Sequence, residues 1–169
     1  MSPHSRIVYV DNDPLVLLQG RALLAGSPEG TTDYIDVEMH DVGKIVHEAA
    51  RTLDFSRPVA IMLLGVLGYA EYDDARSIVK RLLDAVVSGS YLIINDGIKT
   101  TGSNEEGARV ANAAGVMYRL RTFEQIAGFF DGLELVEPGV VPAVRWRPEP
   151  SYNPGAGSEP ATCGVGRKP

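Results

Sequence analysis

The sequence predicts an α/β domain with a doubly wound, mostly parallel sheet, and two patterns lead to this fold class. Over residues 6–94, four short apolar segments alternate with three segments whose apolar residues recur at helical spacing. One of the four, 59–64, is apolar throughout, which is typical of a central parallel strand that is buried on both faces. Strands and helices that alternate in this way favour parallel strands joined by crossover helices.

The elements of this first part begin and end at recognisable signals. Asp13 and Pro14 stand where a helix takes its cap and its first residue, and Gly26 is expected to end that helix. Asp41 is expected to cap the second helix, and Gly89 to end the third. The expected strands are 6–10, 32–36, 59–64 and 91–94, and the expected helices are 14–25, 42–53 and 73–86.

The next part of the chain predicts two more helices and an antiparallel end to the sheet. A helix is expected over 105–114, and the capping box Thr122-Phe-Glu-Gln125 opens another that continues to Phe130. Strands at 133–136 and 141–146 are expected to form a hairpin, because the connector between them is too short for a parallel crossover.

Residues 151–169 are expected to be a disordered tail. They include several glycines and prolines and almost no large apolar side chain, so they offer little apolar surface to bury. We therefore assign one α/β domain to residues 1–150, a length typical of a single domain.

Composition and charge exclude several classes of protein. With 16 basic and 22 acidic residues the formal net charge is −6, which disfavours binding to nucleic acid or to an anionic membrane through charge. The longest apolar run, 59–70, is shorter than the roughly 20 residues that span a bilayer. The single cysteine, Cys163, excludes an internal disulfide and a thiolate-clustered metal site. Because no secretory signal is recognisable, we expect a cytoplasmic protein.

Acidic residues stand at the ends of the first two expected strands, where open parallel sheets bind their ligands. Asp11 directly follows the first strand and is placed to accept hydrogen bonds from a ribose diol. Asp36 ends the second strand and could accept from an adenine amino group, which would leave the backbone N–H of Val37 for a ring nitrogen. Asp36 could instead cap the following turn, but two such residues at successive strand ends favour a nucleoside pocket.

A signalling receiver domain is the alternative from another class of protein. Asp11 and Asp13 resemble the acidic, metal-binding start of a response regulator, which also requires a phosphate-accepting aspartate at the end of the third strand. The third strand here ends in Leu64 and Gly65 without a carboxylate, and Asp54 lies before it, at the opposite end. The sequence therefore favours the nucleoside pocket over the receiver domain.

Five segments, taken in their order along the chain, resemble one known family. They are VYVDNDP at 8–14, LLAGSPEG at 23–30, YID at 34–36, LDFSRPVA at 53–60 and FFDGLELVEPG at 129–139. Together they are similar to the actinobacterial S-adenosyl methyltransferase family, which has a class I, Rossmann-like fold. The resemblance extends over residues 6–148, and Trp146-Arg-Pro resembles the C-terminal end of that family.

This resemblance implies both a sheet and a cofactor. The implied sheet has seven strands in the order 3-2-1-4-5-7-6, with strand 7 antiparallel, and the six strands expected here are then strands 2 to 7. We expect strand 1, with its glycine-rich loop, to be missing. The implied cofactor is S-adenosylmethionine, and no metal ion and no general base are implied. The implied contacts are Asp11 and Asn12 at the ribose, Asp36 and Val37 at the adenine, and Leu64 and Gly65 beside the methionine part.

Two functions follow as hypotheses. The first is an S-adenosylmethionine-dependent methyltransferase-type protein whose methyl acceptor, a small molecule, cannot be read from the sequence. The second is a non-catalytic remnant of that fold that acts through assembly with a partner. Apolar strand edges on either side of a missing strand are templates for pairing, so self-association is expected as well.

Overall fold

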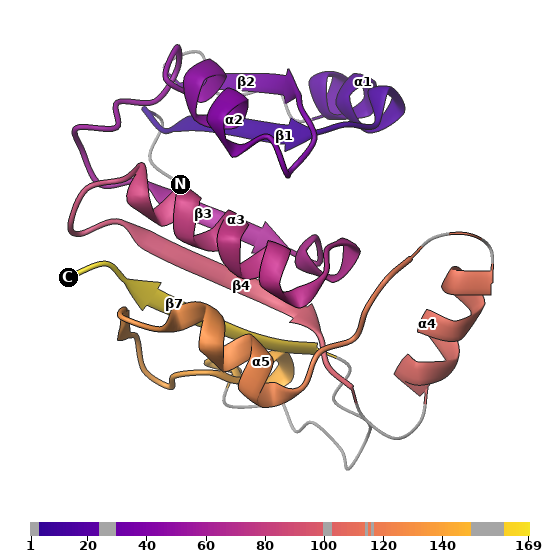
Figure 1. Ribbon diagram of the computed structural model, residues 1–169. Helices are drawn as coiled ribbons and strands as arrows, with labels where there is room; N and C mark the ends of the chain where they lie inside the picture. The colour runs from indigo at the N-terminus through magenta and orange to yellow at the C-terminus, as the bar shows by residue number, and fades with distance from the viewer. Residues whose placement is uncertain (1–3, 24–29, 100–102, 114, 116, 150–160) are drawn as a thin grey trace.

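The computed structural model describes residues 4–23, 30–99, 103–113, 115, 117–149 and 161–169. Helices and strands alternate along the first half of the chain, as Figure 1 shows. No helix in the described ranges combines the length and the apolar character needed to cross a bilayer. The strands are β1 Arg6–Asp11, β2 Thr31–Asp36, β3 Ala60–Leu64, β4 Tyr91–Gly97, β5 Glu134–Leu135, β6 Val141–Pro142 and β7 Ala161–Arg167. The helices are α1 Pro14–Leu23, α2 Val42–Ala49, α3 Tyr72–Asp84, α4 Ser103–Ala113 and α5 Phe123–Ala127, with 3-10 turns η1 Leu67–Tyr69, η2 Gly128–Phe130 and η3 Ala143–Arg145.

The strands form two sheets. β1 and β2 pair in parallel, and the second sheet has the order β3-β4-β7-β5, with β6 also paired to β7. β3 and β4 are parallel, whereas β7 is antiparallel to each of its neighbours. The prediction of a mostly parallel α/β sheet with an antiparallel C-terminal part is thereby confirmed. The two sheets match the parts 3-2 and 4-5-7-6 of the implied seven-stranded order only with β7 as strand 7, a place that the sequence analysis gave to residues 141–146. No pairing joins β1 to β3 within the described ranges.

The C-terminal residues differ from the prediction. Ala161–Arg167, expected in a disordered tail, form β7, which pairs with β4 over its whole length. The predicted hairpin is also wrong, because β5 and β6 both pair with β7 and not with each other. Strand pairing in the expected segment 141–146 is limited to β6, and a 3-10 turn follows it. The remainder of the expected tail, residues 150–160, lies outside the described residues.

β3 is buried on one face only, contrary to the prediction that both faces are covered. Ile61 and Leu63 pack on the main core, whereas the side chains between and beyond them, Met62 and Leu64, are 60% and 52% exposed. The main core lies between the sheet and the residues of α3 and η2, and in Figure 1 α3 and α5 cover the same face of the sheet. Since no described helix covers the opposite face of β3, its apolar side chains there remain accessible.

The helix starts confirm the capping signals of the sequence. Asp13 Oδ1 accepts a hydrogen bond from the N–H of Leu15 at 2.8 Å, and Asp41 Oδ1 accepts from the N–H of Lys44 at 3.1 Å. Both hydrogen bonds of the capping box at Thr122 are present: the Gln125 N–H donates to the Thr122 hydroxyl, and the Thr122 N–H donates to the Gln125 side chain. Each cap of this kind stabilises its helix by about 0.5–2 kcal/mol. Gly26, the expected end of the first helix, lies outside the described residues.

Among the described residues, the two sheets are joined by helix packing and not by strand pairing. Val42 at the start of α2 is buried in the same core cluster as Ile78 and Val79 of α3. Just before α2, the backbone carbonyl of His40 accepts a hydrogen bond from Arg81 Nη1 on α3 at 3.3 Å. The two-stranded sheet therefore sits beside the larger sheet through the contact between α2 and α3.

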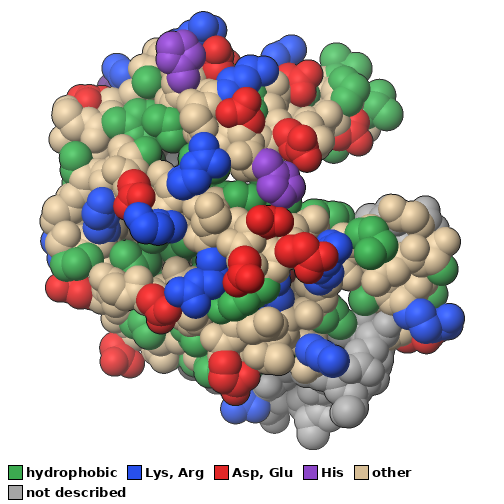
Figure 2. Space-filling view, viewed as in Figure 1, with side chains coloured by type: hydrophobic (Ala, Val, Ile, Leu, Met, Phe, Trp, Pro, Cys, Tyr) green, Lys and Arg blue, Asp and Glu red, His purple; other side chains and the backbone are tan. Residues whose placement is uncertain are grey.

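Exposed apolar side chains lie on β1 and β3, the strand of each sheet that is nearest to the other sheet. On β1, Tyr9 and Val10 are exposed, as are Met62 and Leu64 on β3. Figure 2 shows a further apolar patch at its upper right, over α1, whose exposed residues include Leu15, Leu18 and Leu23. Apolar groups beside an unpaired strand edge favour association with another strand or chain.

Candidate functional site

The two predicted nucleoside-binding carboxylates lie next to each other. In the parallel register of β1 and β2, Asp11 is paired with Asp36 as the last residue of each strand. Both carboxylates therefore stand at the same carboxyl edge, where a ligand of an open parallel sheet binds. Asp11 is half-buried, and Asp36 and the neighbouring Asn12 are exposed.

A local turn orients the Asp11 carboxylate. Its Oδ1 accepts a hydrogen bond from the backbone N–H of Asp13 at 2.8 Å, and Asp13 in turn caps α1. No donor among the described residues contacts the second oxygen, Oδ2. The turn thus holds one carboxylate oxygen and leaves the other for a ligand hydroxyl.

The structure corrects one expectation at this edge. The backbone N–H of Val37, expected to be free for an adenine ring nitrogen, donates to the carbonyl of Asp11 at 3.2 Å. The Val37 side chain is buried in the small core with Ile35 and Ala49. Because the parallel strand pairing continues through this N–H, a ring nitrogen would need another donor.

The residues expected beside the methionine part of the cofactor lie in the other sheet. Leu64 ends β3, and Gly65 follows it with φ +73°, in the left-handed region that favours glycine. The Gly65 N–H donates to the carbonyl of Asn95 in β4 at 2.7 Å. The structure therefore brings Asp11, Asn12, Asp36 and Val37 together and places Leu64 and Gly65 at the end of a different strand.

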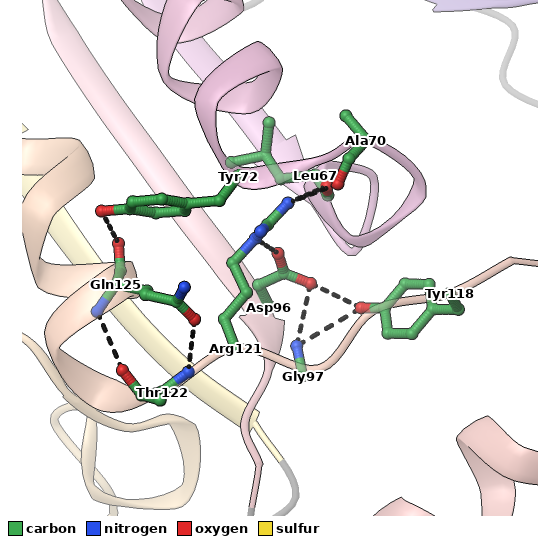
Figure 3. Close-up of polar contacts among 9 residues, drawn as sticks. All are labelled: Leu67, Ala70, Tyr72, Asp96, Gly97, Tyr118, Arg121, Thr122 and Gln125. Carbon is green, nitrogen blue, oxygen red and sulfur yellow. Dashed lines mark hydrogen bonds and ion pairs between the residues drawn. The ribbon is translucent and has the colours of Figure 1, made fainter.

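A buried polar cluster at the end of β4 was not predicted from the sequence. Its centre is Asp96, whose side chain is 1% exposed and whose Oδ1 accepts from Tyr118 Oη at 2.5 Å and from the Gly97 N–H at 2.9 Å. Asp96 Oδ2 lies 3.8 Å from Arg121 Nε, and neither atom has a hydrogen-bond partner in the described part of the chain. Figure 3 shows the three side chains converging from β4 and from the segment before α5.

Arg121 connects this cluster to the turn after β3. Its Nη2 donates to the carbonyls of Leu67 at 2.5 Å and Ala70 at 2.9 Å, the contacts drawn in Figure 3. The guanidinium also lies 5.6 Å from the ring centre of Tyr72 and 5.5 Å from that of Phe129. Such cation–π contacts contribute most when the cation is shielded from water, as this one is. Arg121 therefore fixes η1, the turn that follows Leu64 and Gly65.

Burial sets the protonation of the cluster. It raises the pKa of Asp96 above the ordinary range, and the hydrogen bonds from Tyr118 and Gly97 and the charge of Arg121 offset only part of this shift. Burial also lowers the pKa of Arg121 and, together with the neighbouring Asp96 carboxylate, raises the pKa of Tyr118. Asp96 is thus a carboxyl group whose charged form the fold disfavours.

The sequence indicates only one of the three residues of this cluster. Asp96 stands at the end of the fourth expected strand, as Asp11 does at the end of the first, but the sequence assigned it no role. Tyr118 and Arg121 lie more than 20 positions further along, in no motif and in no predicted helix or strand. Only the folded chain shows that they return to the end of β4.

Comparison with known proteins gives one family, and solved structures that are similar to this chain include the following two. The S-adenosyl methyltransferase family model matches residues 1–169. A DUF574 family protein from Streptomyces avermitilis has a TM-score of 0.91 at 41% identity, which covers 99% of this chain and 67% of that chain. A candidate methyltransferase from Thermobifida fusca has a TM-score of 0.84 at 38% identity, which covers 96% of this chain and 63% of that chain. This chain thus spans about two thirds of the length of each.

A more distant structure shares the fold alone. The N-methyltransferase NodS of Bradyrhizobium japonicum, in complex with S-adenosyl-L-homocysteine, has a TM-score of 0.59 at 12% identity. That match covers 97% of this chain and 67% of NodS. The comparison with curated proteins gives no match. Since the family model matches the entire sequence and the two similar proteins share its fold at about 40% identity, this chain belongs to the S-adenosyl methyltransferase family.

Proposed function

We propose that this chain binds S-adenosylmethionine as the nucleoside-binding part of a methyltransferase. The observation that carries the proposal is the register of β1 and β2, which pairs Asp11 with Asp36 at one carboxyl edge. Membership of the S-adenosyl methyltransferase family supports the identity of the cofactor. The methyl acceptor is a small molecule.

Asp11 and Asp36 have different tasks in this proposal. Asp11, oriented through Oδ1 by Asp13, accepts hydrogen bonds from the ribose hydroxyls through its second oxygen. Asp36 is exposed and accepts from the adenine amino group. Asn12 lines the ribose side, and the buried Val37 side chain supports the strand end beneath the base.

The methionine end of the cofactor borders the turn after β3. The exposed Leu64 side chain offers apolar contact there, and Gly65 allows close approach of the backbone. When bound, S-adenosylmethionine supplies an electrophilic methyl group. Transfer then depends mainly on holding the acceptor in line with that group. Arg121 contributes indirectly, because it fixes the turn through the Leu67 and Ala70 carbonyls.

Calorimetric titration with S-adenosyl-L-homocysteine tests the proposal. Asp11→Ala removes the acceptor of the ribose hydroxyls, so affinity should fall by about 5- to 150-fold, or roughly 1–3 kcal/mol. Asp131→Ala is the matched control. It removes the exposed carboxylate of Asp131, which lies after α5 and pairs with Arg76 on α3. Equal affinity of the wild type and Asp11→Ala, or no binding by the wild type, would contradict the assignment.

A second candidate function, assembly, has its own observation. β1 and β3 each have one unpaired edge in the described part of the chain, and both expose apolar side chains. We propose that a second copy of this chain pairs with these edges, because unpaired N–H and C=O groups beside apolar residues are templates for strand addition. Sedimentation velocity at several protein concentrations measures this association directly.

A further inference from the structure

A hollow with a concentration of positive charge lies between α4 and the segment 117–120. Three cationic side chains line it from three parts of the chain: Lys99 follows β4, Arg109 is on α4, and Arg119 precedes α5. The ring of Tyr118 and the side chain of Leu120 also line it. We call these five residues the cationic hollow.

The charge of the cationic hollow is only partly neutralised. Arg109 forms a two-point contact with Glu106, at 2.9 Å and 2.5 Å, and Arg119 pairs with Glu71 at 2.5 Å. Lys99 is exposed and pairs with no acidic side chain in the described ranges. Both carboxylates are exposed, so their ion pairs with the arginines are weak and can open for another anion. Three cations on one small surface are notable in a chain whose net charge is −6.

Hydrogen bonds hold the chain at three residues of the cationic hollow, Lys99, Tyr118 and Arg119. The Lys99 N–H donates to the carbonyl of Arg121 at 2.7 Å, and the Arg119 N–H donates to the carbonyl of Gly68 at 2.8 Å. Tyr118 is fixed at both ends: its N–H donates to Asn112 Oδ1 at 2.8 Å and its hydroxyl donates to the buried Asp96. Preorganised contacts of this kind lower the entropy cost of binding a ligand.

The cationic hollow adjoins the candidate cofactor residues through η1. Tyr118 contacts Tyr69 of η1 edge-to-face, with ring centres 5.1 Å apart, and η1 follows the end of β3 where Leu64 and Gly65 lie. A molecule bound in the hollow would therefore lie beside the carboxyl ends of β3 and β4. Ligands of an open parallel sheet bind at that edge, so the acceptor and the cofactor would lie close together there.

We propose that the cationic hollow binds the anionic group of the methyl acceptor, and that this acceptor is an organic anion with an apolar body. This role as acceptor site rests on the proposed methyltransferase function. Lys99, Arg109 and Arg119 attract the carboxylate or phosphate group, while Leu120 and the Tyr118 ring contact the apolar body. The proposed class of acceptor, an organic anion, excludes neutral and cationic molecules.

NMR titration of the full 169-residue chain with three small aromatic probes tests this site. Benzoate and phenyl phosphate carry the two anionic groups, and benzamide is the neutral counterpart of benzoate. We expect at least one of the two anions to shift the amide signals of Lys99, Tyr118 and Leu120, and to bind less tightly at higher salt. Comparison of benzoate with phenyl phosphate shows which anionic group is preferred.

Two matched variants separate local from general charge effects. Lys99→Gln should weaken binding of the anion about three- to fivefold. Lys80→Gln removes the same charge from the exposed face of α3, where Lys80 pairs with Asp84, and should leave the affinity unchanged. Equal binding of benzamide and benzoate, equal effects of the two variants, or no binding of either anion would overturn the proposal.

Titration of the same samples with S-adenosyl-L-homocysteine distinguishes the two proposals. If the anion binds and the cofactor product does not, the anion site stands and its role as acceptor site falls together with the proposed function. If the cofactor product binds and no anion does, the cationic hollow is not the acceptor site and the cofactor assignment stands.

Discussion

Replacement of Asp96 by asparagine tests how this fold handles a buried carboxyl group. Asp96 is 1% exposed, and its Oδ2 and the facing Arg121 Nε are both without a hydrogen-bond partner in the described part of the chain. Asparagine has nearly the same shape and keeps an oxygen for the Tyr118 hydroxyl and the Gly97 N–H. Unlike aspartate, it stays neutral at every pH.

The sign of the effect follows from the pKa. Burial raises the pKa of Asp96 in the folded chain above its value in the unfolded chain. Between these two pKa values the folded state binds the additional proton, so the free energy of unfolding falls as pH rises. The stabilising contribution of the protonated carboxyl is complete below the unfolded pKa and is lost as pH passes through the raised one.

The magnitude follows from the same linkage. While pH lies between the two pKa values, the wild type loses up to about 1.4 kcal/mol of unfolding free energy per pH unit through this group. Asp96→Asn has no such loss. The free energy of unfolding of Asp96→Asn minus that of the wild type should therefore increase from about pH 4 upward and level off above the raised pKa.

Urea denaturation followed by circular dichroism between pH 4 and pH 8 measures this difference. Other carboxyl groups with shifted pKa values cancel in the difference; for example, hydrogen bonds from Ser56 lower the pKa of Asp54 in both proteins. Asp131→Asn, at an exposed carboxylate, is the control and should differ from the wild type by a constant. A difference curve for Asp96→Asn that is flat or falls with pH would refute the reasoning. It would mean that Arg121 keeps Asp96 ionised despite its burial.

Two further predictions concern the frame of the molecule. Arg121→Ala should lower the free energy of unfolding by roughly 2–6 kcal/mol in urea denaturation, because it leaves two buried acceptors, the Leu67 and Ala70 carbonyls, without their donor at about 1–3 kcal/mol each. Arg76→Ala, which breaks an exposed ion pair, should cost less than about 1 kcal/mol. Equal costs of the two variants would contradict the anchoring role of Arg121. Met62→Lys places a charge on the exposed face of the edge strand β3 and should shift sedimentation toward monomer, whereas Val110→Lys on α4 should not. A wild type that is monomeric at every concentration would disprove assembly through these edges.

The alternation of strands and helices was predictable because it depends on local chemistry. The apolar residues of α2 and α3 recur at helical spacing, and the carboxylate of Asp41 and the hydroxyl of Thr122 cap their helices as the sequence indicated. The pairing of Asp11 with Asp36 was also predictable in outline, because parallel neighbours end at the same edge. These features depend on residues a few positions apart or on one strand–helix–strand unit.

β7 and the true partners of β5 and β6 were not predictable in this way. Gly164 and Gly166 of β7 look like tail residues, yet side chains from elsewhere occupy the space that their own side chains would need. A Cβ atom on Gly166 would lie 2.9 Å from Leu133 Cδ1, and one on Gly164 would lie 3.0 Å from Phe130 Cζ. Glycine in this strand therefore reflects close packing, which no local pattern reveals.

The sequence by itself determined the family, the alternating α/β order and the two strand-end carboxylates, because motifs, periodicity and caps are properties of neighbouring residues. Only the tertiary structure decided which faces are covered and which distant groups meet. It left one face of β3 open, used the Val37 N–H in strand pairing, and brought Tyr118 and Arg121 to Asp96 at the end of β4. Burial and the pKa shifts that follow from it arise from contacts between segments far apart in the chain, so they exist only once the chain has folded.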